Sequence, residues 1–229
     1  MDAGVEQKIQ PKGTSKQVIV AALVAAVVGA LIARFKLATV PIKNWPVLVS
    51  ILGLVAFNIY WTVAATHAPA KAAESRGSRR IHEVLLNAGY LLILLPEFFT
   101  FAVPRFVAAG PIPAALGLAA QAGGFALAVW ARRRLGQNWS GRIEIKMDHQ
   151  LVRTGPYRLL RHPIYTAVVS MALGMAIVVG KVSALLGVVV IVIAYVRKIR
   201  LEETNMRSAF GAEYDAYCRD TWGLVPGIF

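Results

Sequence analysis

The sequence predicts an all-α, polytopic membrane protein with about six transmembrane helices. Hydrophobic residues make up 57% of the 229 positions and charged residues only 16%, whereas a soluble domain is about half apolar and about a quarter charged. The apolar residues form long runs, and most of the 25 Lys and Arg lie between those runs, against 12 Asp and Glu. Basic loops between apolar spans are typical of membrane proteins, which disfavours a nucleic-acid-binding surface.

Several apolar runs have the length of roughly 20 residues that a helix needs to cross a bilayer core of about 30 Å. The first four predicted spans are Val18–Ala33, Val47–Thr66, Val84–Val103 and Ile112–Ala131. The fifth run, Ile164–Val196, has 33 residues and as one helix would be about 50 Å long. Because Gly180 and Lys181 interrupt it, we predict two shorter helices that form a C-terminal helical hairpin.

The distribution of Lys and Arg predicts the orientation of these spans. With six crossings and the N-terminus inside, the inner segments contain 20 of the 25 basic residues and the outer loops contain five. Positive charges favour the cytoplasmic side, so both termini are predicted to be cytoplasmic. A five-span arrangement places the C-terminal third outside and loses this bias.

The polar segments divide the chain into two predicted regions. Residues 1–131 form an N-terminal bundle of about four transmembrane helices. Residues 132–229 contain a long cytoplasmic loop, the hairpin and C-terminal amphipathic helices. A shorter cytoplasmic loop is predicted at Ala68–Glu83, and the helix that starts at Arg197 is expected to end at Gly211, because glycine breaks helices.

A group of ring-bearing and charged residues is predicted to gather at the cytoplasmic face. His162 and Glu202 are 40 positions apart, but a hairpin between them returns the chain to the same side of the membrane. The residues that should meet there are His149, Tyr157, His162, Tyr165, Lys198, Arg200, Glu202 and Glu203. Adjacent carboxylates among basic and aromatic groups suit a zwitterionic ligand with an extra positive charge. Interfacial aromatics and snorkelling arginines alone explain part of this pattern.

The motifs in this region resemble those of the isoprenylcysteine carboxyl methyltransferase family and, more broadly, of membrane methyltransferases that include phospholipid N-methyltransferases. "HQLVRTGPYRLLRHPIY" is followed, after the hydrophobic hairpin, by "EETNMRSAFGAEYDAY" and a terminal "VP". The resemblance covers Leu135 to Phe229 and rests on the order and spacing of several motifs. It implies an integral membrane enzyme that uses S-adenosylmethionine, bound at the cytoplasmic face, and makes residues 132–229 the catalytic region.

The resemblance also implies which residues bind the cofactor. The predicted cofactor-binding residues are His149, Leu151, Val152, Tyr157, His162, Pro163, Ile164, Tyr165 and Glu202. The arginine with which the family orients the methyl acceptor falls at Lys198, and Arg200 could take that role, because a lysine is a point charge whereas an arginine grips a carboxylate with two donors. Ala167 replaces a glycine of the family pattern. Arg142 stands where relatives present glutamine, so its participation is left open.

The residue types fit the chemistry of this cofactor. A glutamate complements its cationic groups, a tyrosine face attracts a sulfonium by a cation–π interaction, and methyl transfer depends mainly on positioning. The predicted acceptor is lipophilic and enters from the membrane, and an isoprenylcysteine-like carboxylate is favoured. A carboxylate is ionised at neutral pH and needs no base. For a phospholipid amine or a thiol acceptor, Glu203 or His162 would serve as the base. Lys198, Arg200 and Glu203 are therefore the predicted catalytic residues.

Other functions remain as alternatives. A sterol-reductase-like oxidoreductase has similar C-terminal motifs but binds NADPH, whose 2′-phosphate the two glutamates would repel. A non-catalytic membrane protein such as a transporter leaves the motifs unexplained.

Metal binding is not expected, because His149 and His162 lack the spacing of zinc ligands. Cys218 cannot form an internal disulfide, since it is the single cysteine. Glu97 is an ionisable residue within a span, where such residues are often functional, although its position near the outer boundary also permits a structural role.

Overall fold

The computed structural model describes residues 45–63, 71–72, 74–98, 102–136, 144–145 and 151–228. The predicted first span, Val18–Ala33, lies outside these residues. The elements in chain order are α2 (Trp45–Val63), β1 (Lys71–Ala72), α3 (Arg76–Phe98), α4 (Pro111–Leu135), β2 (Glu144–Ile145), the 3₁₀ turn η3 (Gly155–Arg158), α5 (Pro163–Val179), α6 (Val182–Phe210) and α7 (Ala212–Asp220).

The predicted all-α class is confirmed for the part of the chain that the structure describes. The one departure there is a two-residue antiparallel ladder, in which Lys71 pairs with Ile145 and Ala72 with Glu144. Among the described helices, α2, α4 and α6 have the length and apolar composition needed to cross a membrane, and α5 is a shorter apolar helix. Long apolar helices satisfy all their backbone groups internally, as a bilayer requires.

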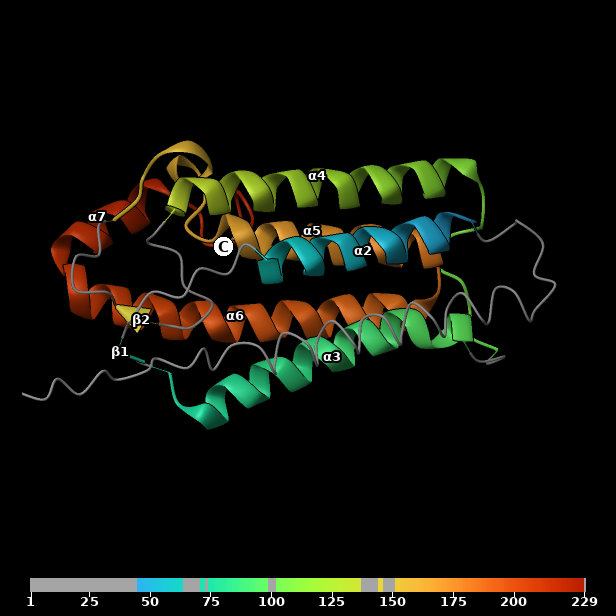
Figure 1. The fold of residues 1–229 in the computed structure, drawn as a ribbon, viewed down its shortest axis with the longest axis horizontal. Helices are drawn as coiled ribbons and strands as arrows, with labels where there is room; N and C mark the ends of the chain where they lie inside the picture. Colours follow the sequence, from blue (N-terminus) through green and yellow to red (C-terminus); the bar gives the residue numbers. More distant parts are fainter. Residues whose placement is uncertain are drawn as a thin grey trace, which may run out of the picture.

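The helices lie side by side with their long axes roughly aligned (Figure 1). α4 packs on α5, α5 on α6 and α6 on α3, while α2 contacts α4 and α5. The central core combines side chains from these helices, including Phe57, Ile93, Met171, Met175 and Ile191. α7 and η3 lie together at one end of the bundle, beyond the end of α4 (Figure 1). The segment before α5 and the segment after α6 therefore meet at a single end of the bundle.

Glycines allow the closest helix pairs to form. A methyl group added at Gly117 of α4 would lie 2.5 Å from the carbonyl oxygen of Gly174 in α5, and one added at Gly89 of α3 would lie 2.8 Å from that of Gly187 in α6. Small residues at such crossings let helix backbones approach closely, which favours helix association in membranes. The sequence of these helices thus specifies α4·α5 and α3·α6 as the tightest contacts.

Two predicted boundaries were wrong. The predicted loop Ala68–Glu83 is helical from Arg76 onward, so α3 begins eight residues before the apolar run at Val84. The side chain of Ser75 accepts a hydrogen bond from the backbone N–H of Ser78 and so caps this helix start. The helix expected to start at Arg197 is a continuation of α6, which runs unbroken to Phe210 and ends at Gly211 as predicted.

The predicted interruption at Gly180 and Lys181 separates α5 from α6. Gly180 has a φ of 70°, in the left-handed region that favours glycine, and it ends α5. Lys181 then places its Nζ 3.2 Å from Oε1 of Glu97 and donates a hydrogen bond to the carbonyl of Pro96. Glu97 therefore has a structural partner at the end of the bundle that holds the α5–α6 connection, far from α7 and η3.

Candidate functional site

The site is built where the C-terminal segment after α7 folds back onto the residues before α5. Backbone hydrogen bonds join Arg161 to Trp222, His162 to Gly223 and Trp222 to Leu159. The hydroxyl of Thr166 donates to the carbonyl of Leu224. Pro163, fully buried at the first turn of α5, suits this position because the first turn leaves backbone N–H groups unpaired. These contacts fix the loop Leu159–His162 against the start of α5.

Arg161 connects this loop to both α6 and the end of α7. Its Nε donates to Oε1 of Glu203 at 2.8 Å, and its Nη1 donates to the carbonyls of Cys218 and Thr221. Glu203 also lies 3.5 Å from Arg207. The side chains of Arg161 and Glu203 are 12% and 10% exposed, so this ion pair is largely shielded from solvent. A buried carboxylate with such partners stays ionised.

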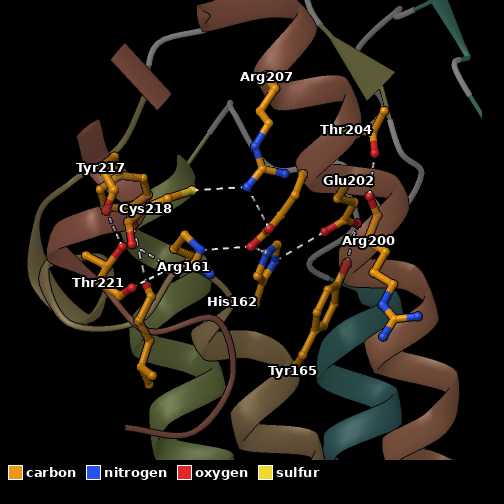
Figure 2. A network of polar contacts seen from close by, with 12 residues as sticks. Arg161, His162, Tyr165, Arg200, Glu202, Thr204, Arg207, Tyr217, Cys218 and Thr221 are labelled. Atoms are coloured by element: carbon orange, nitrogen blue, oxygen red, sulfur yellow. Dashed lines mark hydrogen bonds and ion pairs between the residues drawn. The ribbon is translucent and has the colours of Figure 1, made fainter. Parts of the chain in front are cut away.

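His162 lies between the two adjacent glutamates of α6. Its Nδ1 is 3.4 Å from Oε2 of Glu202 and its Nε2 is 3.5 Å from Oε1 of Glu203. Figure 2 shows the ring of His162 pointing toward Glu202 from the start of α5. The predicted meeting of His162 with Glu202 is therefore confirmed. Burial lowers the pKa of His162, but the hydrogen bonds and charges of Glu202 and Glu203 outweigh it, so its pKa is raised.

Tyr165 completes the contacts of Glu202. Its hydroxyl donates to Oε1 of Glu202, and its ring stacks on that of His162 with 5.4 Å between centroids and an interplanar angle of 3°. The Nζ of Lys198 lies 5.4 Å from the centroid of the Tyr165 ring. Lys198 and Glu202 are one helical turn apart, as their spacing predicts. The side chain of Glu202 is 20% exposed, so it is the more accessible of the two glutamates.

Apolar members of the predicted cofactor wall also come together. Tyr157 and Ile164 form one buried cluster with Ala131, against which Val152 and Tyr165 pack. The carbonyl of Tyr157 accepts a hydrogen bond of 2.6 Å from the hydroxyl of Tyr217. Burial raises the pKa of Tyr157, so its phenol stays neutral. Leu151 lies half-buried at the start of the described segment.

The remaining predicted residues are not part of this cluster. Arg200 is exposed, and Figure 2 shows its guanidinium directed away from His162 and Glu202. His149 and Arg142 lie outside the described residues. Ala167 is fully buried, and its carbonyl faces Gly124 of α4. In the segments that the structure describes, no three His, Cys, Asp or Glu side chains are arranged so that they could hold a metal ion.

Sequence reasoning missed three contributors to the site. Arg161 belongs to the "RHP" motif, and that position could have indicated its role. Thr221 contributes a carbonyl, and Tyr217 a hydroxyl that binds a carbonyl. Main-chain partners give no signal in the sequence, because any residue supplies the same group.

The arrangement presents a carboxylate and an aromatic face beside a lysine ammonium. Glu202 has the charge to bind a cationic group, and the ring of Tyr165 already holds a cation near its face, which is the geometry of a cation–π contact. The Nε2 of His162 is buried, and its polar neighbour is Oε1 of Glu203 at 3.5 Å. The donors and acceptors of the site therefore suit a ligand that carries both charges.

Comparison with known proteins matches the same region. Residues 112–213 match the family model described as phospholipid methyltransferase. Over 88 residues the chain is 31% identical to a probable protein-S-isoprenylcysteine O-methyltransferase of Oryza sativa subsp. indica, and the match to the corresponding protein of subsp. japonica has the same identity and length. The resemblance to the isoprenylcysteine carboxyl methyltransferase family is confirmed.

The fold extends this likeness beyond the matched sequence. The structure of the eukaryotic intramembrane Ras methyltransferase, an isoprenylcysteine carboxyl methyltransferase, superposes with a TM-score of 0.55 and 20% identity, covering 92% of this chain and 76% of that protein. At this identity the match to the isoprenylcysteine carboxyl methyltransferase shows a shared fold. The sequence matches cover 38% of this chain and 46% of each rice protein, so the chain spans about half the length of the curated relatives it matches.

Proposed function

We propose that this protein is an integral membrane methyltransferase that transfers the methyl group of S-adenosylmethionine to a lipophilic acceptor. The observation that carries the proposal is the position of Glu202, which is held by His162 and Tyr165 within the region matched by the methyltransferase family model. The rice relatives and the structural neighbour are named as isoprenylcysteine methyltransferases. The favoured acceptor is accordingly the carboxylate of an isoprenylcysteine-like substrate.

The described residues fit the proposed cofactor. Glu202 would bind its cationic part, and His162 and the hydroxyl of Tyr165 would hold Glu202 in place for that contact. Tyr157, Ile164 and Val152 would form the apolar wall, with Leu151 and Pro163 beside it. His149 lies outside the described residues and stays a predicted cofactor contact. When bound, S-adenosylmethionine supplies an activated methyl group, and the protein contributes mainly position and orientation.

The surroundings of the second glutamate favour a carboxylate acceptor. Glu203 accepts a hydrogen bond from Arg161 at 2.8 Å and has Arg207 nearby. A carboxylate stabilised by two arginines is a poor base, because both charges favour its ionised form. An amine or thiol acceptor would require a base, whereas a carboxylate acceptor would require only a cation to orient it. We assign that orientation to Lys198, while Arg200 stays the alternative from the exposed side of α6.

The membrane arrangement is part of the same proposal. We infer about six crossings. Four of them, Val18–Ala33, α2, α3 and α4, belong to the N-terminal bundle of residues 1–131, and α4 continues past residue 131 to Leu135. The other two are α5 and α6, which form a transmembrane hairpin in residues 132–229. Both termini and the cofactor site would be cytoplasmic, because the basic residues favour that side. The acceptor would reach Lys198 from the lipid.

Calorimetry on the purified protein in detergent tests the proposal. S-adenosylmethionine should bind and NADPH should not, since an NADPH-dependent reductase is the alternative with similar motifs. Labelled S-adenosylmethionine is then offered with farnesylcysteine, phospholipids or small thiols. The proposal predicts transfer to farnesylcysteine as a base-labile ester. Binding of NADPH alone would contradict the methyltransferase assignment, and transfer to phospholipid or thiol would contradict the acceptor.

A further inference from the structure

A chain of four aromatic rings runs from α3 to the proposed cofactor site. His82 of α3 contacts Tyr195 of α6 with 5.2 Å between centroids, and Tyr195 contacts Tyr165 of α5 at 4.7 Å. Tyr165 in turn stacks on His162. His82 precedes the region matched by the methyltransferase family model, so nothing in that match involves it. The site is thereby connected to a helix from the other half of the chain.

The two rings of this chain that lie farthest from the proposed cofactor site, His82 and Tyr195, are buried and held in place. His82 is 7% exposed and Tyr195 is 6% exposed. The Nδ1 of His82 lies 3.3 Å from the carbonyl oxygen of Ala194, the residue before Tyr195. The contribution of His82 to this chain of rings is therefore its shape and one polar contact with the backbone.

The inner contacts explain why this support matters. Tyr165 touches Tyr195 on one side, with an interplanar angle of 32°, and His162 on the other, with an angle of 3°. Its ring plane is therefore fixed between two neighbours. The direction of its hydroxyl, which donates to Glu202, follows from that plane because the hydroxyl lies in it. The position of Lys198 over the same ring depends on it as well.

We infer that Tyr195 and His82 are positioning residues of the cofactor site, which fix the ring of Tyr165 and thereby the orientation of Glu202. This inference rests on the proposed function. Neither residue touches the cofactor in this assignment. They act through Tyr165, with His82 supporting Tyr195 and Tyr195 supporting Tyr165. The ring, not the hydroxyl, of Tyr195 is the essential part.

The test compares Tyr195→Leu, Tyr195→Phe and His82→Ala with Phe125→Leu. Phe125 of α4 contacts the rings of Phe57 and Tyr60 and packs against the central core, so its variant is a control for general damage to the bundle. In calorimetry with S-adenosylmethionine, Tyr195→Leu should weaken binding by about twofold to tenfold, the fold-change that an aromatic pair contributes. Tyr195→Phe should bind as the unmodified protein does, and His82→Ala should show a smaller loss. Equal losses for Tyr195→Leu and Phe125→Leu would overturn the inference.

A measurement without cofactor separates this inference from the proposed function. Histidine-selective NMR follows the titration of His162, whose surroundings comprise Glu202, Glu203, Arg161, Tyr165 and Lys198. If Tyr195 positions Tyr165 and Glu202, Tyr195→Leu should lower the pKa of His162, and Phe125→Leu should leave it unchanged. An unchanged pKa in Tyr195→Leu would overturn the inference. Failure of the unmodified protein to bind S-adenosylmethionine would instead contradict the proposed function, and the NMR result would still decide whether Tyr195 positions the cluster.

Discussion

The Nδ1 of His162 lies 3.4 Å from Oε2 of Glu202, although α5 and most of α6 separate the two residues along the chain. This contact exists because α5 and α6 fold back on each other at Gly180. It places a histidine between two carboxylates at the end of the bundle where α7 and the C-terminal segment also arrive. The stability of this end of the molecule should therefore depend on the charge of His162.

The first prediction concerns pH. The carboxylates of Glu202 and Glu203 raise the pKa of His162 in the folded protein, against the effect of burial. A raised pKa stabilises the folded state fully below the unfolded value of about 6.5, and this contribution is lost as the pH rises through the folded value. The difference in thermal stability between the unmodified protein and His162→Gln should therefore be large at pH 6 and shrink at higher pH. A constant difference across this range would contradict the assigned pKa shift.

The second prediction concerns the α4·α5 contact. A methyl group at Gly117 would lie 2.5 Å from the carbonyl oxygen of Gly174 and 2.7 Å from Val178, whereas one at Gly123 of the same helix meets nothing within 4 Å. Gly117→Ala should lower the free energy of unfolding by about 1–3 kcal/mol because the helices must separate. Gly123→Ala should be neutral or slightly stabilising. Thermal unfolding in detergent compares the two, and equal effects would contradict the predicted close approach.

The third prediction concerns the ion pair at the opposite end of the bundle. Glu97 and Lys181 lie 3.2 Å apart with side chains 15% and 18% exposed. Lys181→Met should destabilise the protein by about 3 kcal/mol, because it leaves a shielded carboxylate without its cation. The double variant Lys181→Met with Glu97→Gln should recover part of this loss, as a double-mutant cycle would reveal. Cofactor binding should change little, since neither residue is near the site. Loss of binding without loss of stability would instead give Glu97 a functional role.

The fourth prediction concerns the C-terminal segment. A chain that ends at Asp220 loses the carbonyls that bind Arg161, His162 and Thr166. It should bind S-adenosylmethionine at least about tenfold more weakly, because several hydrogen bonds to the loop before α5 disappear together. A chain that ends at Val225 keeps all of these contacts and serves as the control. Equal binding by both truncated chains would contradict the role of this segment.

Much of the arrangement could be predicted from the sequence because membrane helices follow directly from apolar length. The observed bounds of α2 and α4 and the break at Gly180 lie within a few residues of the predicted ones. The start of α3 could not be predicted from apolarity, since Arg76–Glu83 is polar. Its helical form depends on tertiary contacts such as the hydrogen bonds from Arg197 to Ser78. The predicted helical hairpin also implied that His162 and Glu202 would meet, because it returns the chain to the same end of the bundle.

The sequence did not predict how the site is supported. Arg200 was expected in the cluster, but it follows the buried Ile199 on α6. Successive side chains on a helix are about 100° apart, so Arg200 lies on the exposed side of α6. The ring chain through Tyr195 and His82 could not be predicted, because it requires knowledge of which face of α3 packs on α6. That face is determined by Gly89 and Gly187, whose partners cannot be assigned from one sequence.

The most direct test of the central claim is the affinity for S-adenosylmethionine when Glu202 loses its charge. Glu202→Gln keeps the size of the side chain, and Glu213→Gln is the control, since the side chain of Glu213 is 60% exposed and pairs with Arg153 at the surface. Isothermal titration of both variants should show that Glu202→Gln binds at least about tenfold more weakly than the unmodified protein, because a hydrogen bond to a charged group contributes about 1.5–3 kcal/mol. Glu213→Gln should bind normally. Equal affinity of Glu202→Gln and the unmodified protein would contradict the assignment of the cofactor site.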